Sequence, residues 1–183
     1  HLLRRQRQMC IRDRSMIDNL KKSWSVGYKM KIDSNVDDLW NVITKPGHLE
    51  MVHPFCKENY PILWDKENSK DVLVYTNGVK LIREFKSWKE KQGYSLEIGT
   101  KNGRKSLVEW KISTENQKTY LSIRVYTFFM RERSLIISFL PHFIFIYPNL
   151  RKYLKSVIGG INYYLKNKKR VPRNYFGSHR WFS

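Results

Sequence analysis

The stretch WSVGYKMKIDSNVDDLWNVI, which spans residues 24–43, decides the fold prediction. Residues 24–33 alternate apolar and polar side chains, and this two-residue period is typical of a strand with one buried face. Ser34 and Asn35 then offer a helix N-cap, after which residues 36–43 carry apolar side chains at helical spacing and aspartates in the first turn. The stretch therefore predicts a strand that leads directly into a short amphipathic helix.

Further strands are expected between this helix and the C-terminal third of the chain. Residues 48–53 (HLEMVH) follow a Lys-Pro-Gly sequence that ends the helix, and they are expected to form a loop or a second short helix. Beyond them, Asn-Gly and Gln-Gly pairs separate apolar runs, and Asn-Gly is the strongest short-range signal for a hairpin. The short turns predict an antiparallel meander with strands at about 60–65, 71–77, 79–89, 93–100, 106–113 and 119–129.

The C-terminal third has a different character. Residues 135–147 (LIISFLPHFIFIY) form an uncharged run of thirteen residues, whereas a membrane-spanning helix needs about 20. Residues 148–165 carry apolar side chains at three- and four-residue steps, which predicts a long amphipathic helix. Its Gly-Gly pair at 159–160 costs roughly 1 kcal/mol per glycine relative to alanine, so we expect the helix to lie close to the sheet or to a ligand there. The aromatic tail 171–183 is expected to pack on the body of the domain.

Length and composition set the outer bounds of the prediction. The 183 residues suffice for one domain, and a hydrophobic content of 41% supplies a core. Cys10 and Cys56 are too few for a disulfide framework or a four-thiolate zinc site. The net charge of +19 indicates that an acidic partner or surface must be considered.

The N-terminal residues 1–15 (HLLRRQRQMCIRDRS) are expected to lie outside the folded domain, which we place at 16–183. They lack the apolar core and the cleavage site of a signal peptide. The run RRQRQMCIRDR resembles translated sequencing-adapter read-through. The alternative is a native basic arm that would bind nucleic acid or acidic lipid through its charge. In either case we expect the segment to be disordered.

The order strand, short helices, antiparallel sheet and long terminal helix resembles the START and Bet v 1-like (SRPBCC) superfamily, which includes polyketide cyclases and lipid transfer domains. Residues 33–40 (DSNVDDLW) match the Ala-Ser-Pro-Glu-like start of its first helix, and the resemblance runs from about Ser23 to Lys169. HPFC at 53–56 and GSHRWFS at 177–183 look like a bacterial branch. The resemblance implies an α+β helix-grip fold, with two short helices after the first strand and a curved antiparallel sheet that wraps the C-terminal helix around an apolar cavity. It implies no particular catalyst and no cofactor.

The alternation of side chains predicts which residues face this cavity. In residues 79–85 the inward apolar positions carry Arg83 inward with them, and a charge on an apolar face needs a partner. Arg83 is a candidate to hold the carboxylate or phosphate of an otherwise apolar ligand. The alternatives are an ion pair with a protein carboxylate or a bulge that turns it to water. The full set of predicted lining residues is Leu81, Arg83, Phe85, Leu96, Trp110, Ile123, Val157 and Ile161.

His53, Cys56 and Tyr75 are weaker candidates for catalysis. His53 and Cys56 form His-x-x-Cys in a proline-containing loop, and a thiolate needs a nearby base or positive charge to be reactive. A free cysteine more often behaves as a small apolar filler. We expect no metal site, because His48, His53 and Cys56 would supply three ligands without a second cluster to close the site.

Three function classes remain open. The first is binding of a hydrophobic or lipid-like small molecule in the cavity, without catalysis. The second is a cyclase or dehydratase in which His53, Arg83 or Tyr75 orients the substrate and moves protons. The third is docking on an anionic membrane through basic residues and Phe139, Phe143 and Phe145. Nucleic-acid binding is disfavoured, because charge alone supports it. The expected location is the cytoplasm, free or at the membrane surface.

Overall fold

The computed structural model describes residues 25–127 and 142–183, and of residues 142 and 143 only the backbone. The elements follow one another in the order that the sequence predicts: one strand, two short helices, six further strands and a long helix. Their bounds are β1 Ser25–Ile32, α2 Val36–Ile43, α3 Leu49–Val52, β2 Cys56–Leu63, a 3₁₀ turn Lys66–Asn68, β3 Lys70–Tyr75, β4 Lys80–Lys89, β5 Gly93–Gly99, β6 Lys105–Glu115, β7 Lys118–Tyr126, a π-helical turn His142–Ile146 and α5 Tyr147–Asn167.

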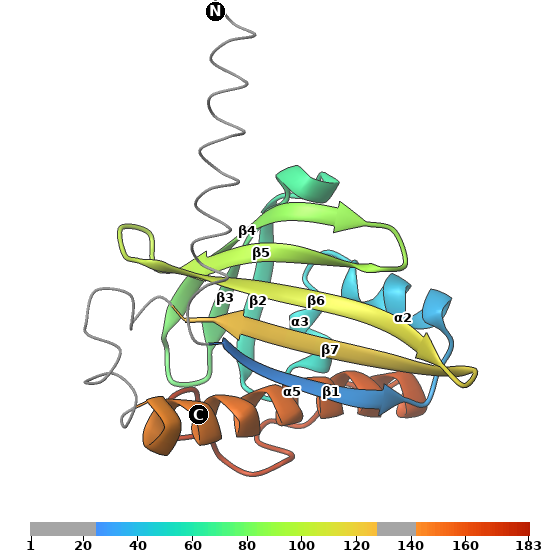
Figure 1. Ribbon diagram of the computed structural model, residues 1–183. Helices are drawn as coiled ribbons and strands as arrows, with labels where there is room; N and C mark the ends of the chain where they lie inside the picture. The colour runs from blue at the N-terminus through green and yellow to red at the C-terminus, as the bar shows by residue number, and fades with distance from the viewer. Residues whose placement is uncertain (1–24, 128–141) are drawn as a thin grey trace, which may run out of the picture.

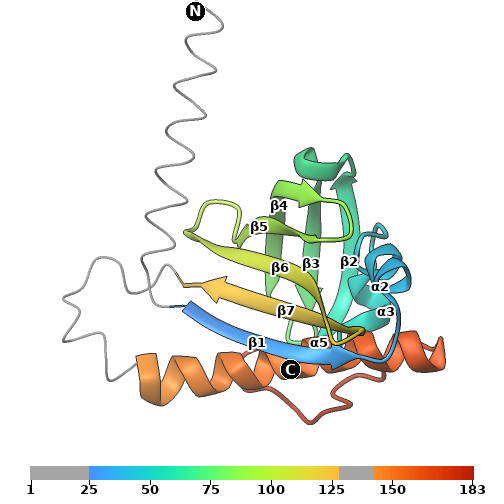
Figure 2. The same cartoon turned by 45° about the vertical axis from the view of Figure 1, so that its right-hand side comes forward.

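The strands form one seven-stranded sheet in the order β1-β7-β6-β5-β4-β3-β2, and every neighbouring pair is antiparallel. The sheet is strongly curved: β1, β7 and β6 run across the molecule, while β2 and β3 stand steeply behind them (Figures 1 and 2). Helix α5 lies along the lower side in both views and packs against β1, β7, α2 and α3. This arrangement confirms the predicted helix-grip architecture.

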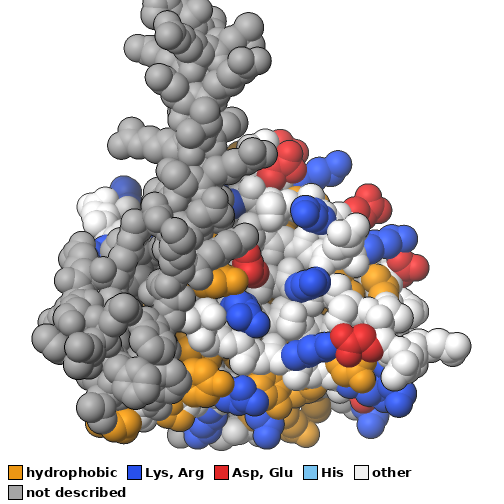
Figure 3. Space-filling model, viewed as in Figure 1, with side chains coloured by type: hydrophobic (Ala, Val, Ile, Leu, Met, Phe, Trp, Pro, Cys, Tyr) orange, Lys and Arg blue, Asp and Glu red, His pale blue; other side chains and the backbone are white. Residues whose placement is uncertain are grey.

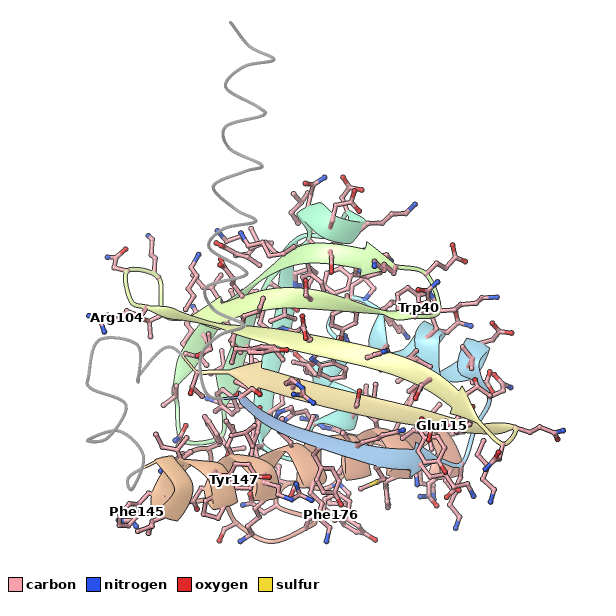
Figure 4. All side chains as sticks on the ribbon, viewed as in Figure 1. Trp40, Arg104, Glu115, Phe145, Tyr147 and Phe176 are labelled. Atoms are coloured by element: carbon pink, nitrogen blue, oxygen red, sulfur yellow. The ribbon has the colours of Figure 1, made fainter. Side chains whose placement is uncertain are left out.

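The short helix α2 forms where its N-cap and apolar face predict it. The Asn35 side chain accepts a hydrogen bond from the Asp38 backbone N–H at 2.7 Å, which satisfies one of the free donors of the first turn. Its apolar face buries Leu39, Trp40 and Ile43. Helix α2 therefore covers the end of the sheet where Figure 4 labels Trp40.

Aromatic side chains fill this same end of the space between sheet and helices. Phe85 packs edge-on against Trp64, with ring centroids 5.4 Å apart, and against Tyr94 at 5.1 Å. Trp88 joins them from the same strand and meets Trp40 of α2 at 5.5 Å. Large rings therefore fill this end, and the cavity described below lies toward the opposite end of the sheet.

Helix α5 crosses its neighbours closely at its two glycines. A Cβ atom on Gly160 would lie 2.1 Å from the carbonyl oxygen of Val52 in α3, so only glycine fits there. A Cβ atom on Gly159 would meet the Phe176 ring at 3.0 Å. The close approach predicted for this pair exists, and the atoms nearest to the two glycines belong to Val52, Pro54 and the C-terminal tail rather than to the sheet.

Strand β2 begins earlier than the sequence indicates and includes Cys56, for which the sequence predicts a loop. Cys56 pairs with Tyr75 of β3, and the register shifts twice before the strand ends, once around Pro61. A proline and irregular pairing are tolerated because β2 is an edge strand of the sheet. These interruptions hide the strand from a period-based prediction. The expectations for residues 1–15 and Phe139 lie outside the described residues, as does the side chain of Phe143.

Candidate ligand-binding cavity

A cavity of about 760 Å³ lies between the sheet and the N-terminal half of α5. It extends toward the end of the molecule where the β3–β4 and β5–β6 turns, the end of β7 and the start of α5 come together, on the left of Figure 1. Most of its wall is aliphatic or aromatic. Its lining residues include Leu49, Leu73, Leu81, Leu96, Ile98, Val108, Trp110, Ile123, Val125, Ile146, Leu150, Leu154 and Val157.

Most of the residues predicted to face a cavity lie in its wall. These are Leu81, Arg83, Leu96, Trp110, Ile123 and Val157. Phe85 and Ile161 do not, which corrects the prediction for both. Phe85 belongs to the aromatic cluster described above, and Ile161 is fully buried in the packed core one turn of α5 beyond Val157. Alternation gives the face on which a residue lies, but it does not give the point along the strand or helix at which packed core becomes open space.

Arg83 is neutralised by a protein carboxylate. Its Nε donates to Asp71 Oδ1 at 2.7 Å and its second nitrogen donates to Asp71 Oδ2, in a bidentate pair with both side chains almost fully buried. Asn59 donates a further hydrogen bond to Asp71 at 3.0 Å. Burial alone would raise the pKa of Asp71, but the charge and hydrogen bonds of Arg83 outweigh it and hold this pKa below its ordinary value. The cavity wall therefore carries an ion pair here rather than a free cation.

A hydrogen-bonded chain of three side chains forms a further polar part of the cavity wall. Tyr153 of α5 lies between His53 and Tyr75, with its hydroxyl 2.9 Å from His53 Nε2 and 2.8 Å from the Tyr75 hydroxyl. The other ring nitrogen of His53, Nδ1, accepts a hydrogen bond from the Phe55 backbone N–H at 3.2 Å. Each of the three chain members lines the cavity.

Burial removes the acid–base character of these groups near neutral pH. Burial, with the nearby charge of Arg83, lowers the pKa of His53 to about 3. Burial raises the pKa of Tyr75 to about 12 and that of Tyr153 well above its ordinary value. At pH 7 the imidazole is therefore neutral and both phenols keep their hydrogens.

Cys56 and His53 are close in sequence but do not form a catalytic pair. The two nitrogens of His53 bond to Phe55 and Tyr153, and burial raises the pKa of the Cys56 thiol to about 12. Cys56 thus packs as an apolar side chain with 1% of its surface exposed. Within residues 25–127 and 142–183, no group of histidine, cysteine and carboxylate side chains could hold a metal ion.

The C-terminal tail covers the phenol pair. The Phe182 ring stacks on Tyr75 and packs at a tilt against Tyr153, with centroid distances of 4.5 and 4.6 Å. Thr76 and Asn77, in the β3–β4 turn, donate hydrogen bonds to the carbonyl oxygens of Phe182 and Trp181 at 2.8 and 2.7 Å. The expectation that the tail packs on the body is thereby met. Its place in the cavity wall was not predicted, nor was that of Tyr153, although a tyrosine on an aliphatic helix face is a usable signal.

The far rim of the cavity is polar as well. Thr100, Arg104, Ser106 and Thr127 line it where β5, β6 and β7 meet. Figure 4 places Arg104 at the same end of the molecule as Phe145, away from Trp40. Among the described helices, none combines the length and the apolar composition needed to cross a membrane.

No protein-family model and no curated protein matches the chain in sequence. Solved structures do resemble it. DynU16, from the dynemicin biosynthetic locus, superposes with a TM-score of 0.61 at 13% identity over 80% of this chain. CalU16 from Micromonospora echinospora gives 0.54 at 14% identity over 79% of this chain and 77% of its own. Ara h 8.0201 gives 0.57 at 10% identity over 78% of this chain and 97% of its own.

These identities are low, so the likeness bears on the fold. The chain spans about half the length of DynU16, of which the superposition covers 48%. A curved seven-stranded antiparallel sheet around a long C-terminal helix is common to this chain and its structural neighbours. The fold is therefore the helix-grip fold of Bet v 1-like proteins, as the sequence resemblance implies.

Proposed function

We propose that the protein binds a hydrophobic or lipid-like small molecule in the cavity between the sheet and α5. The observation that carries this proposal is the cavity itself, with about 760 Å³ and a mainly apolar wall. Small-molecule sites typically enclose about 300–1,000 Å³ behind apolar side chains, with a few polar groups that fix orientation. The His53–Tyr153–Tyr75 chain and the buried Arg83–Asp71 pair supply such groups.

Packing energetics support the same conclusion. Protein interiors are normally filled to crystal-like density, and voids larger than a water molecule are few. An apolar cavity of about 150 Å³ already stays dry and takes up benzene. The cavity of this protein is several times larger. Along most of its wall, water molecules would find few hydrogen-bond partners. An apolar guest would recover dispersion contacts that the wall lacks when it is empty.

A cyclase or dehydratase activity is the alternative with less support. Such chemistry needs a general acid or base whose pKa lies near the working pH. His53 and Tyr75, the two titratable catalytic candidates in the wall, have pKa values of about 3 and about 12. Arg83, the third candidate, is held by Asp71. The arrangement suits orientation of a guest better than proton transfer to it.

Membrane docking is a second candidate, because Phe145, one of the three phenylalanines expected to contact a membrane, is exposed. Ile144 and Phe145 are 54% and 60% exposed, and Ile146 directly after them lines the cavity. Figure 3 shows hydrophobic side chains beside lysines and arginines along the lower edge, where α5 lies. Exposed rings next to basic residues suit an anionic bilayer surface. A Phe145→Ser variant should pellet less with vesicles of 30% phosphatidylserine at low salt, and no pelleting of the unchanged protein would exclude docking.

A fluorescence titration tests the principal proposal. The uncharged fluorophore N-phenyl-1-naphthylamine should bind saturably to one site per chain. Val108→Phe extends a ring from β6 into the cavity and should weaken this binding several-fold. Ile112→Val is the matched control, because Ile112 lies on the same face of β6 in the packed core and does not line the cavity. Equal binding in all three proteins, or no binding by the unchanged protein, would refute the proposal.

A further inference from the structure

We infer that the guest of this cavity carries an uncharged hydrogen-bond acceptor, such as a ketone or ester carbonyl, and that a phenolic O–H of the Tyr75–Tyr153 pair donates to it. This inference rests on the proposed function and adds the chemical class of the ligand. It follows from the direction of the hydrogen-bonded chain, which the structure fixes at one end.

The fixed end is the imidazole of His53. Its Nδ1 accepts a hydrogen bond from the Phe55 N–H, so this nitrogen carries no hydrogen. Because the ring is neutral at pH 7, its single hydrogen lies on Nε2. Nε2 therefore donates to the Tyr153 hydroxyl, 2.9 Å away. With the opposite tautomer, Nε2 would be an acceptor and the whole chain would run the other way.

A count of hydrogens gives the consequence for the cavity. The chain holds three polar hydrogens, one on His53 Nε2 and one on each of Tyr153 and Tyr75. Two hydrogen bonds join these groups, and each uses one hydrogen. One phenolic hydrogen is left over, whichever tyrosine donates in the bond between them, and no acceptor for it lies among the described residues. Both phenols line the cavity, so the surplus donor is available to a guest.

The electrostatics of the wall favour a neutral acceptor over an anion. Arg83 is the nearest buried cation, and Asp71 neutralises it through two hydrogen bonds. Arg104 lies at the far rim in the β5–β6 turn, and in the sheet β6 is three strands away from β3, which carries Tyr75. A carboxylate beside the phenol pair would thus be buried with one neutral donor, and the guanidinium of Arg83 is already bonded to Asp71, so the carboxylate would lack a hydrogen-bonded charge partner, which is unfavourable.

The C-terminal tail keeps the donor in place. Phe182 stacks on the Tyr75 ring, packs at a tilt against the Tyr153 ring and is itself held by Thr76, so neither phenol ring can turn away freely. An acceptor oxygen at this point would sit at the covered end of the cavity, with the apolar body of the ligand along the aliphatic wall. The expected guest is therefore an apolar molecule with a neutral oxygen at one end.

Three probes of closely matched shape test the inference by isothermal titration calorimetry: 2-acetylnaphthalene, 2-isopropenylnaphthalene and 2-naphthoate. The ketone should bind roughly two- to tenfold more tightly than the hydrocarbon, the gain of one neutral hydrogen bond. The carboxylate should bind more weakly than the ketone. The Tyr75→Phe/Tyr153→Phe double variant should bind ketone and hydrocarbon equally, with affinity for the hydrocarbon retained.

Two measurements on the unchanged protein make the test independent of whether the double variant folds. The carbonyl stretch of bound ¹³C-labelled 2-acetylnaphthalene should lie at lower wavenumber than in cyclohexane. Nitrogen-15 NMR of His53 should show hydrogen on Nε2 and none on Nδ1. The opposite tautomer, an unshifted carbonyl stretch, tightest binding of the carboxylate or a ketone preference that survives in the double variant would each overturn the inference. If the hydrocarbon still binds, the proposed function stands, whereas failure of every apolar probe removes both.

Discussion

Two phenylalanine substitutions on one strand, at Val108 and at Ile112, distinguish an open cavity from a filled core. Val108 and Ile112 lie four residues apart on β6, both point to the inner face, and both are buried, with 7% and 6% exposed. The cross-strand neighbours of Val108 are Leu96 and Val125, which line the cavity with it. Ile112 pairs with Leu121, which is fully buried. We therefore expect phenylalanine to be accepted at position 108 and rejected at position 112.

The expected magnitudes follow from the space at each position. Val108→Phe adds four carbon atoms that can enter the cavity, and at about 0.8 kcal/mol per buried carbon the gain is at most about 3 kcal/mol. Ile112→Phe adds three carbon atoms within the packed core, and overpacking typically costs about 1–3 kcal/mol. For a protein of this size, 1 kcal/mol shifts the melting temperature by roughly 2–4 °C. Val108→Phe should therefore melt at or above the temperature of the unchanged protein, and Ile112→Phe roughly 2–12 °C below it.

Differential scanning calorimetry measures both shifts, and urea unfolding at 25 °C converts them to free energies. The comparison is internal, because strand, face and burial are matched and only the adjoining space differs. Equal destabilisation by the two substitutions would mean that the surroundings of Val108 are packed. In that case the cavity, and the ligand-binding account built on it, would be wrong.

Three further predictions concern helix packing, pH and the tail. Gly160→Ala places a Cβ atom 2.1 Å from the Val52 backbone oxygen and should lower the melting temperature although alanine favours helix by about 1 kcal/mol, whereas Gly159→Ala meets only a movable ring and should leave it unchanged or raised. The pKa of His53 falls from 6.5 to about 3 on folding, so the unfolded chain binds more protons between these values. Stability in urea should therefore be full above about pH 6.5 and fall toward pH 3, by up to about 1.4 kcal/mol per pH unit for this group, and His53→Gln should reduce that slope. Phe182→Ala removes the ring that covers the phenol pair, so N-phenyl-1-naphthylamine should dissociate faster in stopped-flow measurements; an unchanged rate would mean that the tail does not close the cavity.

Local sequence signals were sufficient for the framework of the fold. The first strand and α2 lie where alternation, the Asn35 cap and the apolar spacing place them, because each depends on residues close together in the chain. Alternation also placed Arg83 on the inner face. Its partner was not predictable, because Asp71 lies on the neighbouring strand β3 and meets Arg83 only through the register of that pair.

The candidate site depends on contacts that no local pattern records. The hydrogen bond between His53 and Tyr153 joins residues 100 positions apart, and the stacking of Phe182 on Tyr75 joins the tail to β3. The extent of the cavity has the same origin. Phe85 was expected in its wall, but the β4 bulge just after it and the surrounding aromatic rings make that end solid core. Long-range packing therefore decides which inward residues meet a ligand.

Native mass spectrometry of the protein, purified without denaturation and then offered fatty alcohols, fatty acids and phospholipids, tests the central claim most directly. The account predicts one small molecule per chain, released into organic solvent and identifiable there, and retained less well by Val108→Phe than by Ile112→Val. A chain that is measured at its bare mass after purification, and that stays at this mass with fatty alcohols, fatty acids and phospholipids, would contradict the claim.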